Sequence, residues 1–222
     1  MISVVVRSKA DPRVERAAAT RRRMVKAAYH LFSTQGLNTP MTTIAEEASV
    51  AVQTLYFTFH TKARLLMAAH DYAVLGEDEI EPQNRPAMVR MRAASDQRSV
   101  IDATVQVSRE IIPRIGPLLW HMQTAVDDPE IMSALAQRER LRVEGYADIV
   151  EALMRRGPLR KGVTRQTAID ILLALTSSQF VMFLMRERGW TIEAWSEWSV
   201  DCLCESLLPP PGRPARRYAA QN

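Results

Sequence analysis

The sequence predicts an all-α protein with a small N-terminal helical domain and a larger C-terminal helical domain. No stretch alternates apolar and polar residues for long enough to form a sheet. Apolar residues instead recur at helical spacing through several long segments, and Pro and Gly residues separate these segments. The 222 residues are 47% hydrophobic, which is enough apolar material for a sizeable core.

The first third of the chain predicts one long helix and three shorter ones. In the long helix the apolar residues between Met24 and Phe32 form a single stripe, and Gly36 follows as a stop signal. Thr39 can cap the second helix, with Pro40 at its first position. The expected helices cover Asp11–Gln35, Pro40–Ala48, Val52–Phe59 and about Lys62–Leu75, with a tight turn at Ser49 and Val50.

The rest of the chain predicts further helices after a polar connector. This connector runs from Gly76 to Ser99 and holds a short helix near Pro86–Ala94. Glycines and prolines separate the later segments. We expect helices at about Val100–Ile115, Pro117–Val126, Pro129–Arg156, Thr164–Glu187 and Ile192–Leu208. The final segment, Pro209–Asn222, is rich in Pro and Arg and is expected to be disordered.

The net charge of +4 is unevenly distributed along the chain. Residues 1–62 hold nine Lys and Arg against four Asp and Glu, whereas residues 63–205 hold seventeen against twenty-one. A basic N-terminal segment on an acidic body suggests that a polyanion docks at one end. A solvated basic arm would give the same charge pattern, so charge alone does not decide between the two.

The sequence gives little support for catalysis or metal binding. The two cysteines, Cys202 and Cys204, are two residues apart on a predicted helix and therefore point in different directions. The four histidines are scattered without a zinc-binding pair, and the glycine patterns of nucleophile elbows, P-loops and dinucleotide sites are missing from the sequence. We therefore expect no enzyme, no metal and no cofactor.

Two apolar stretches are the candidates for a targeting or membrane segment. The run Ile2–Val6 is shorter than the apolar region of a signal peptide. The stretch Ala168–Met185 is interrupted by Asp170 and by several hydroxyl and amide residues, which argues against a membrane span. With only two cysteines, a reducing cytoplasm is the expected location.

The segment between Met41 and Lys62 carries the strongest functional signal. Two short helices joined by a tight turn form a compact pair, and Leu55 and Phe59 are expected in the core that they share with the first helix. The opposite face of the third helix presents small, hydroxyl and amide side chains, which suit the major groove of DNA. Gln53 can bond adenine through two hydrogen bonds, Thr54 can reach several bases, and Val52 can touch a thymine methyl.

The same segment resembles the TetR family of transcriptional regulators. The matching stretches are TRRRMVKAAYHLFSTQG and TTIAEEASVAVQTLYFTFHTKARLL, within Thr20–Leu66. The resemblance implies a three-helix, helix-turn-helix DNA-binding domain followed by a helical ligand-binding and dimerisation domain. It also implies phosphate contacts from Tyr56 and Lys62. The positions that would face DNA are Ala51, Val52, Gln53, Thr54, Phe57 and Thr58.

The chain departs from the family pattern at three places. Ser49 replaces the glycine of the turn, and Pro40 replaces the threonine that opens the second helix, so Thr39 or Thr42 must supply that phosphate contact if it is made. The exposed face of the third helix has no Arg or Lys, which leaves base readout to Gln53 and Thr54. Affinity is then expected to depend on phosphate contacts and on an N-terminal arm. The basic residues of that arm are Arg7, Lys9, Arg13 and Arg16.

The resemblance also assigns roles to the C-terminal part. TetR-family proteins dimerise through their last two long helices, here Thr164–Glu187 and Ile192–Leu208. The first is apolar nearly all round, so it must be covered by its own core or by a partner. A small, apolar effector is expected among the helices after the fourth, where Met and Trp residues are adaptable ligand contacts, although core packing explains them equally well. The candidate effector residues are Met88, Met91, Trp120, His121 and Met122.

These observations predict an arm at 1–16, a DNA-binding domain at 17–77 with its motif at about 41–60, an effector and dimerisation domain at 78–208, and a tail at 209–222. The expected function is a dimeric repressor that a small molecule releases from a palindromic DNA operator. An activator of the same fold remains an alternative, as does a helical ligand-binding or enzymatic domain that has lost DNA binding.

Overall fold

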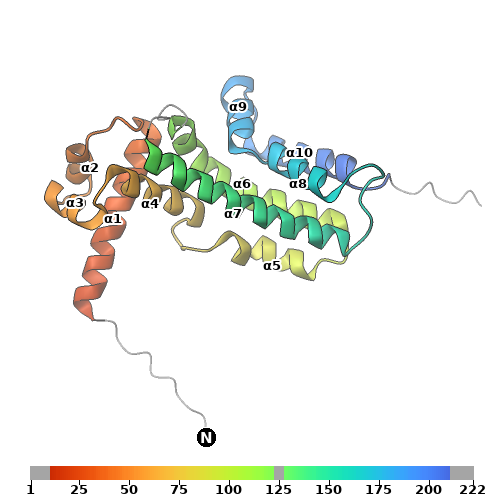
Figure 1. Ribbon diagram of the computed structural model, residues 1–222, viewed down its shortest axis with the longest axis horizontal. Helices are drawn as coiled ribbons and strands as arrows, with labels where there is room; N and C mark the ends of the chain where they lie inside the picture. Colours follow the sequence, from red (N-terminus) through yellow and green to blue (C-terminus); the bar gives the residue numbers. More distant parts are fainter. Residues whose placement is uncertain (1–10, 123–127, 211–222) are drawn as a thin grey trace, which may run out of the picture.

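A computed structural model describes residues 11–122 and 128–210 of the chain, and within these ranges it is helical with no strand. Four helices form an N-terminal head and the others form a larger body (Figure 1). The head helices are α1 (Pro12–Thr34), α2 (Met41–Glu47), α3 (Val52–Phe59) and α4 (Lys62–Leu75). The body helices are η1 (Pro82–Asn84), α5 (Pro86–Ala93), α6 (Gln97–Met122), α7 (Pro129–Met154), α8 (Arg165–Leu175), α9 (Ser178–Arg188) and α10 (Ile192–Leu207).

The head folds around the apolar stripe of α1. Asp11 caps α1 by accepting from the Arg13 amide at 2.8 Å, and Pro12 occupies the first turn, where a missing N–H has no cost. The buried side of the helix, from Met24 to Phe32, packs against α2 and α4. The core of the head also takes in Leu118 of α6 and Ile131 of α7, so the head is joined to the body by apolar contacts.

The body is built on two long helices, α6 and α7. In Figure 1, α5 lies along one side of this pair and α8 and α10 lie along the other. Trp195 of α10 is fully buried at the centre of the body, together with apolar residues of α6, α7 and α8. The all-α fold with its two helical parts is therefore confirmed.

The predicted break in α6 is wrong. The segments expected at Val100–Ile115 and Pro117–Val126 form one helix that contains Pro113 and Pro117 and runs to Met122, while residues 123–126 lie outside the described part. Each proline removes a backbone hydrogen bond and costs about 3 kcal/mol. Burial of apolar side chains in the flanking turns keeps the helix continuous. These side chains are Ile112, Ile115 and Leu118.

The single helix predicted at Thr164–Glu187 is also wrong, because the structure divides it into α8 and α9 at Thr176 and Ser177. The Thr176 hydroxyl bonds back to the Leu172 carbonyl at 2.7 Å and also meets the hydroxyl of Tyr146. The Trp195 indole N–H donates to the Leu175 carbonyl at 3.2 Å. Side chains therefore satisfy the backbone groups that the break exposes.

The break between α8 and α9 divides the stretch that could otherwise be read as a membrane-spanning helix. Arg165–Arg188 is the one stretch of the described chain that is long and apolar enough to cross a bilayer by length and composition. The two helices that form it have 11 residues each, whereas a spanning helix needs about 20. Leu172 and Val181 are buried within the body, and 39% of the apolar window as a whole is buried.

Candidate nucleic-acid interface

The turn between α2 and α3 sets the direction of the third helix. Ser49 has a φ of 52°, in the left-handed region that glycine adopts most easily. The Val50 amide donates to the Ala45 carbonyl at 2.9 Å and closes the turn. His60 has a φ of 63° directly after α3. Non-glycine residues in this conformation therefore lie at both ends of the helix, and packing must hold them there.

The two faces of α3 differ sharply. Leu55 and Phe59 are 0% and 3% exposed and anchor the helix in the head. On the outer side Phe57 is 84% exposed, and Gln53 and Thr54 are also exposed. This confirms that the predicted readout side chains face the surrounding solvent.

The remaining α3 positions contribute less open surface. Ala51 is exposed at the N-cap position, whereas Val52 and Thr58 are half-buried. The Thr58 hydroxyl donates to the Thr54 carbonyl at 2.8 Å, so its proton is already used within the helix. Gln53 and Thr54 remain the best-placed hydrogen-bonding groups on this surface.

Of the two residues expected to contact phosphate, Tyr56 lies within α3 and Lys62 begins α4. Tyr56 is 47% exposed, so it is not a core aromatic. Lys62 begins α4, and its Nζ lies 5.9 Å from the centre of the Phe32 ring. Partial burial lowers the pKa of Lys62. Its charge lies at the N-terminus of α4, where backbone N–H groups attract anions.

The structure separates the two threonines offered for the remaining phosphate contact. Thr39 is 4% exposed, and its hydroxyl donates to the Gly36 carbonyl at 2.8 Å. It therefore neither caps α2, whose N-cap is Pro40 with no side-chain hydrogen bond, nor presents its hydroxyl to the surface. The expectation for Thr39 is corrected for this reason. Thr42 is exposed in the first turn of α2.

The basic arm expected at 1–16 overlaps α1. Arg13 and Arg16, which were expected in this arm, belong to α1 and are exposed. Arg7 and Lys9 lie outside the described residues.

Two arginines of the head make contacts that the sequence did not predict. The Arg21 guanidinium of α1 lies 5.0 Å from the centre of the Phe59 ring. Arg64 of α4 donates through Nε to Glu130 of α7 at 3.3 Å, and the Thr61 hydroxyl donates to the same carboxylate at 3.1 Å. Helical spacing from the buried stripe could have placed Arg21 near α3, whereas no local signal links residues 64 and 130.

A pair of guanidinium groups joins the head to the body. Arg114 of α6 donates to the Ala73 carbonyl at 3.0 Å and to the Val74 carbonyl at 3.3 Å. Arg85 donates to the Val74 carbonyl at 2.8 Å and pairs with Glu110 at 2.8 Å. Both arginines thus satisfy free carbonyls at the C-terminus of α4. Burial lowers the pKa of Arg114, with Arg85 adding to the effect.

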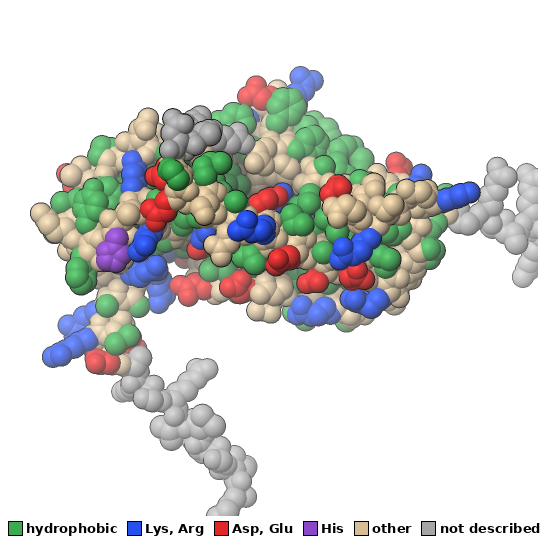
Figure 2. Space-filling model, viewed as in Figure 1, with side chains coloured by type: hydrophobic (Ala, Val, Ile, Leu, Met, Phe, Trp, Pro, Cys, Tyr) green, Lys and Arg blue, Asp and Glu red, His purple; other side chains and the backbone are tan. Residues whose placement is uncertain are grey.

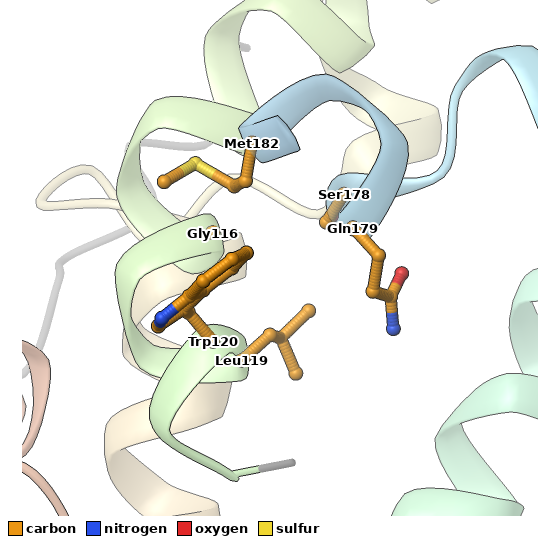
Figure 3. A pocket seen from close by; sticks show the side chains of 6 residues that line it. All are labelled: Gly116, Leu119, Trp120, Ser178, Gln179 and Met182. Carbon is orange, nitrogen blue, oxygen red and sulfur yellow. The ribbon is translucent and has the colours of Figure 1, made fainter. Parts of the chain in front are cut away.

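The candidate effector residues do not come together. Met88 and Met91 pack in the body core, whereas Met122 belongs to the core of the head. The His121 ring lies against Gly36. Trp120 lies beside Gly116 and Met182 in a hollow between α6 and α9 (Figure 3). The Arg186 guanidinium lies 5.2 Å from the centre of its ring. That hollow has no enclosed space that would hold even a water molecule, whereas common ligand pockets measure ~300–1,000 Å³.

The head matches a known family model. Residues 24–69 match the model described as "Bacterial regulatory proteins, tetR family". The N-terminal domain belongs to the TetR family. The match runs from the first buried residue of α1 into α4 and includes the whole helix-turn-helix segment expected from the sequence.

Solved structures share the fold of the whole described chain. NalD of Pseudomonas aeruginosa, the secondary repressor of the MexAB-OprM multidrug efflux pump, is 22% identical with a TM-score of 0.66, covering 87% of this chain and 98% of that one. A Saccharomonospora viridis transcriptional regulator in complex with choline is 17% identical with a TM-score of 0.65, covering 86% and 98%. The fatty acid degradation regulator FadR of Bacillus halodurans is 13% identical with a TM-score of 0.65, covering 88% and 96%. The search of curated proteins found no match.

Proposed function

We propose that this protein is a dimeric repressor that binds a palindromic DNA operator through α3 and leaves it when a small molecule binds the body. The exposed face of α3 carries this proposal. Its solvent-facing amide, hydroxyl and aromatic groups, on Gln53, Thr54 and Phe57, match the donors, acceptors and methyl groups of a major groove. Tyr56, Lys62 and Thr42 supply the phosphate contacts that fix the register.

A second copy of the chain is the proposed partner of α8, α9 and α10. Phe183 of α9 and Trp198 of α10 are exposed, and Phe180 packs against Trp198 with the ring centres 6.2 Å apart. Aromatic side chains of this kind are enriched in the cores of protein interfaces. Dimerisation would present two copies of α3, which must lie about 34–36 Å apart to enter successive major grooves.

Effector control is proposed to act through the joint between head and body. Arg85 and Arg114 hold the C-terminus of α4, so a shift of α6 would move the head. A ligand that prefers the shifted conformation weakens DNA binding, and DNA weakens ligand binding by the same factor. We place the effector in the body, near Met88 and Met91. NalD represses an efflux pump and another similar structure holds choline, so both apolar and small cationic compounds belong in a first screen.

The test is a fluorescence anisotropy titration of the full-length protein with labelled duplexes from the DNA upstream of its own gene. The repressor proposal predicts binding whose log affinity falls linearly with the log of the salt concentration. A chain that has lost DNA binding would bind none of the duplexes above the level of a scrambled duplex, and this result would overturn the proposal. A reporter fused to the bound promoter separates repressor from activator by the sign of the change in expression.

A further inference from the structure

The turn between α9 and α10 holds an open groove. Gly189 ends α9 with a φ of 72°, and the Trp190 amide that follows donates to the Leu184 carbonyl at 3.0 Å. Thr191 then caps α10 by accepting from the Ala194 amide at 3.1 Å. In Figure 1, α9 rises from the body beside α10, and Figure 2 shows hydrophobic side chains exposed on this part of the molecule. The groove has a volume of about 480 Å³ and is lined by Gly189, Trp190, Thr191, Ala194, Glu197 and Trp198.

Two tryptophans form one corner of this groove. The ring centres of Trp190 and Trp198 lie 5.5 Å apart, and the ring planes meet at 83°. An aromatic ring is electron-rich on its faces, so two planes at nearly a right angle present two such faces to the same corner. Trp198 is 36% exposed and Trp190 is half-buried, so solutes can reach the corner. Tryptophan faces attract cations more strongly than those of any other side chain.

The cations of the chain itself leave this corner open. Arg186 stacks on Trp120, with the guanidinium 5.2 Å from the ring centre. Trp195 is fully buried and is not open to a cation from solution. Among residues 11–122 and 128–210, no lysine or arginine stacks on Trp190 or Trp198. The two remaining tryptophans are therefore the ones available to an external cation.

A carboxylate without a cationic partner stands beside the corner. Glu193, Glu197 and Asp201 follow one another at four-residue spacing along α10. Arg109 of α6 pairs with Glu193 at 2.9 Å, and Arg98 of α6 pairs with Asp201 at 2.9 Å. The sequence of α6 has no lysine or arginine between these two arginines. Glu197 is exposed, lines the groove and takes part in none of the ion pairs found in the described part of the chain.

We propose that this groove binds a small organic ammonium cation, with its alkyl groups against the faces of Trp190 and Trp198 and its charge beside Glu197. Alkylated ammonium ions combine a positive charge with an apolar surface, which is what an aromatic corner beside a carboxylate accommodates. The groove volume lies within the ~300–1,000 Å³ of common ligand pockets. The site is separate from the effector position proposed near Met88 and Met91, and it does not depend on DNA binding.

One wall of the groove also belongs to the surface proposed to meet a second copy. The Trp198 ring lies beside Phe180 of α9 as well as beside Trp190 of the turn. The cation site needs the groups of one chain only, because both rings and the carboxylate come from the same turn and helix. Binding should therefore survive Phe183→Ala, which removes an exposed ring of the proposed interface but no lining residue of the groove.

The experiment is an NMR titration of the ¹⁵N-labelled full-length protein with tetramethylammonium. Tert-butanol serves as an uncharged probe of similar size. The indole N–H signals of the four tryptophans are followed, after each has been assigned from a Trp→Phe variant. The methyl protons of the probe report the ring faces directly, because protons held over an aromatic face shift upfield. The test variants are Trp190→Leu and Glu197→Gln, and Glu205→Gln removes the same charge elsewhere on α10 as the matched control.

Tetramethylammonium should shift the indole signals of Trp190 and Trp198, and its methyl protons should move upfield. Trp120 and Trp195 should not respond, because one carries Arg186 and the other is buried. Trp190→Leu keeps an apolar side chain but removes a ring face, so affinity should fall roughly fivefold. Glu197→Gln should lower affinity by roughly two- to fivefold, as expected for one exposed charge. Glu205→Gln should bind like the wild type, and tert-butanol should cause none of these changes.

Unshifted Trp190 and Trp198 signals in the wild type, or equal shifts with tert-butanol, would overturn the proposal. An equal loss of affinity in Glu197→Gln and Glu205→Gln would indicate attraction to the general charge of α10 and would also overturn it. Loss of binding in Phe183→Ala would rule out a site built by one chain. None of these results bears on the proposed DNA binding, because every lining residue lies outside the head.

Discussion

The helices α3 and α9 both expose a phenylalanine, but the surroundings of the two rings differ. Phe57 on α3 is 84% exposed and lies among the amide and hydroxyl groups of Gln53 and Thr54. Phe183 on α9 is 47% exposed and belongs to a helix whose neighbours are the apolar Leu184 and the aromatic cluster around Trp198. An exposed aromatic ring therefore does not by itself identify a partner.

The groups around each ring indicate what each helix binds. Hydrogen-bonding groups beside an apolar ring suit base edges, which combine donors, acceptors and thymine methyl groups. Apolar and aromatic groups beside a ring suit another protein surface, which removes them from water. The first surface is small and anchored by two buried residues, whereas the second spans a helix break and extends over α10.

The largest expected effect comes from the anchor of α3. Replacing the fully buried Leu55 by Ala leaves a cavity in the head and should destabilise the protein by about 2–5 kcal/mol. DNA binding should be lost or strongly weakened, because α3 loses its fixed orientation. Urea unfolding followed by circular dichroism measures the first effect, and anisotropy measures the second. If the variant unfolded at the same urea concentration as the wild type, the burial of Leu55 would not be what holds α3 in the head.

The comparison of the two aromatic surfaces is tested by making the same substitution, phenylalanine to glutamate, on α3 and on α9. Phe57→Glu should weaken DNA binding, because like charges brought together at an interface cost several kcal/mol, and it should leave the oligomeric state unchanged. Phe183→Glu should dissociate the dimer, as removal of a buried interface aromatic costs about 2 kcal/mol or more. Analytical ultracentrifugation and anisotropy are run on both variants. Dissociation by Phe57→Glu, or an intact dimer in Phe183→Glu, would break the comparison.

A smaller and more specific effect is expected at Gln53. Removing its amide should relax sequence preference at one base pair by about 1–3 kcal/mol while other positions keep their preference. Lys62→Ala should instead weaken binding to all sequences by a similar factor, since it contacts phosphate. A panel of operator duplexes with single base changes measures both. Unchanged preference in Gln53→Ala would remove this residue from the readout.

The smallest effect concerns the contact that holds α4 against α7. Partial burial opposes ionisation of Asp71, but hydrogen bonds from His70 and Arg138 outweigh it and lower the pKa of Asp71. A lowered pKa contributes stability that is present above the unfolded-state value, near 4, and is lost as the pH falls through the folded-state value. Asp71→Asn should therefore be slightly less stable at neutral pH and less sensitive to acid. Urea midpoints between pH 7 and pH 3 measure this, with Asp148→Asn as the control in the exposed part of α7.

Local signals in the sequence predicted the head to within a few residues. The α3 bounds are those expected, and α1 and α4 begin or end beside the capping residues Asp11 and Gly76. The exposed positions of Gln53 and Thr54 also followed from helical spacing. These features depend on neighbours within one or two turns, which is why sequence reasoning reached them.

The errors arose where distant contacts decide the structure. Pro113 and Pro117 suggested a helix end, but burial of the surrounding turns kept α6 intact. The break at Thr176 is satisfied by Tyr146 and Trp195, which lie 30 and 19 residues away in the sequence. Helical spacing likewise could not show that Met88 and Met122 would fall in separate cores. Assignment of the effector residues remains a prediction for this reason.

The most direct test of the central claim, that the outer face of α3 binds DNA, is a salt titration of the wild type and Phe57→Glu with the same upstream duplex. The account predicts salt-dependent binding by the wild type and a loss of at least tenfold in affinity for the variant, with an unchanged dimer and unchanged unfolding midpoint. Equal affinity of the two proteins for the duplex would contradict it.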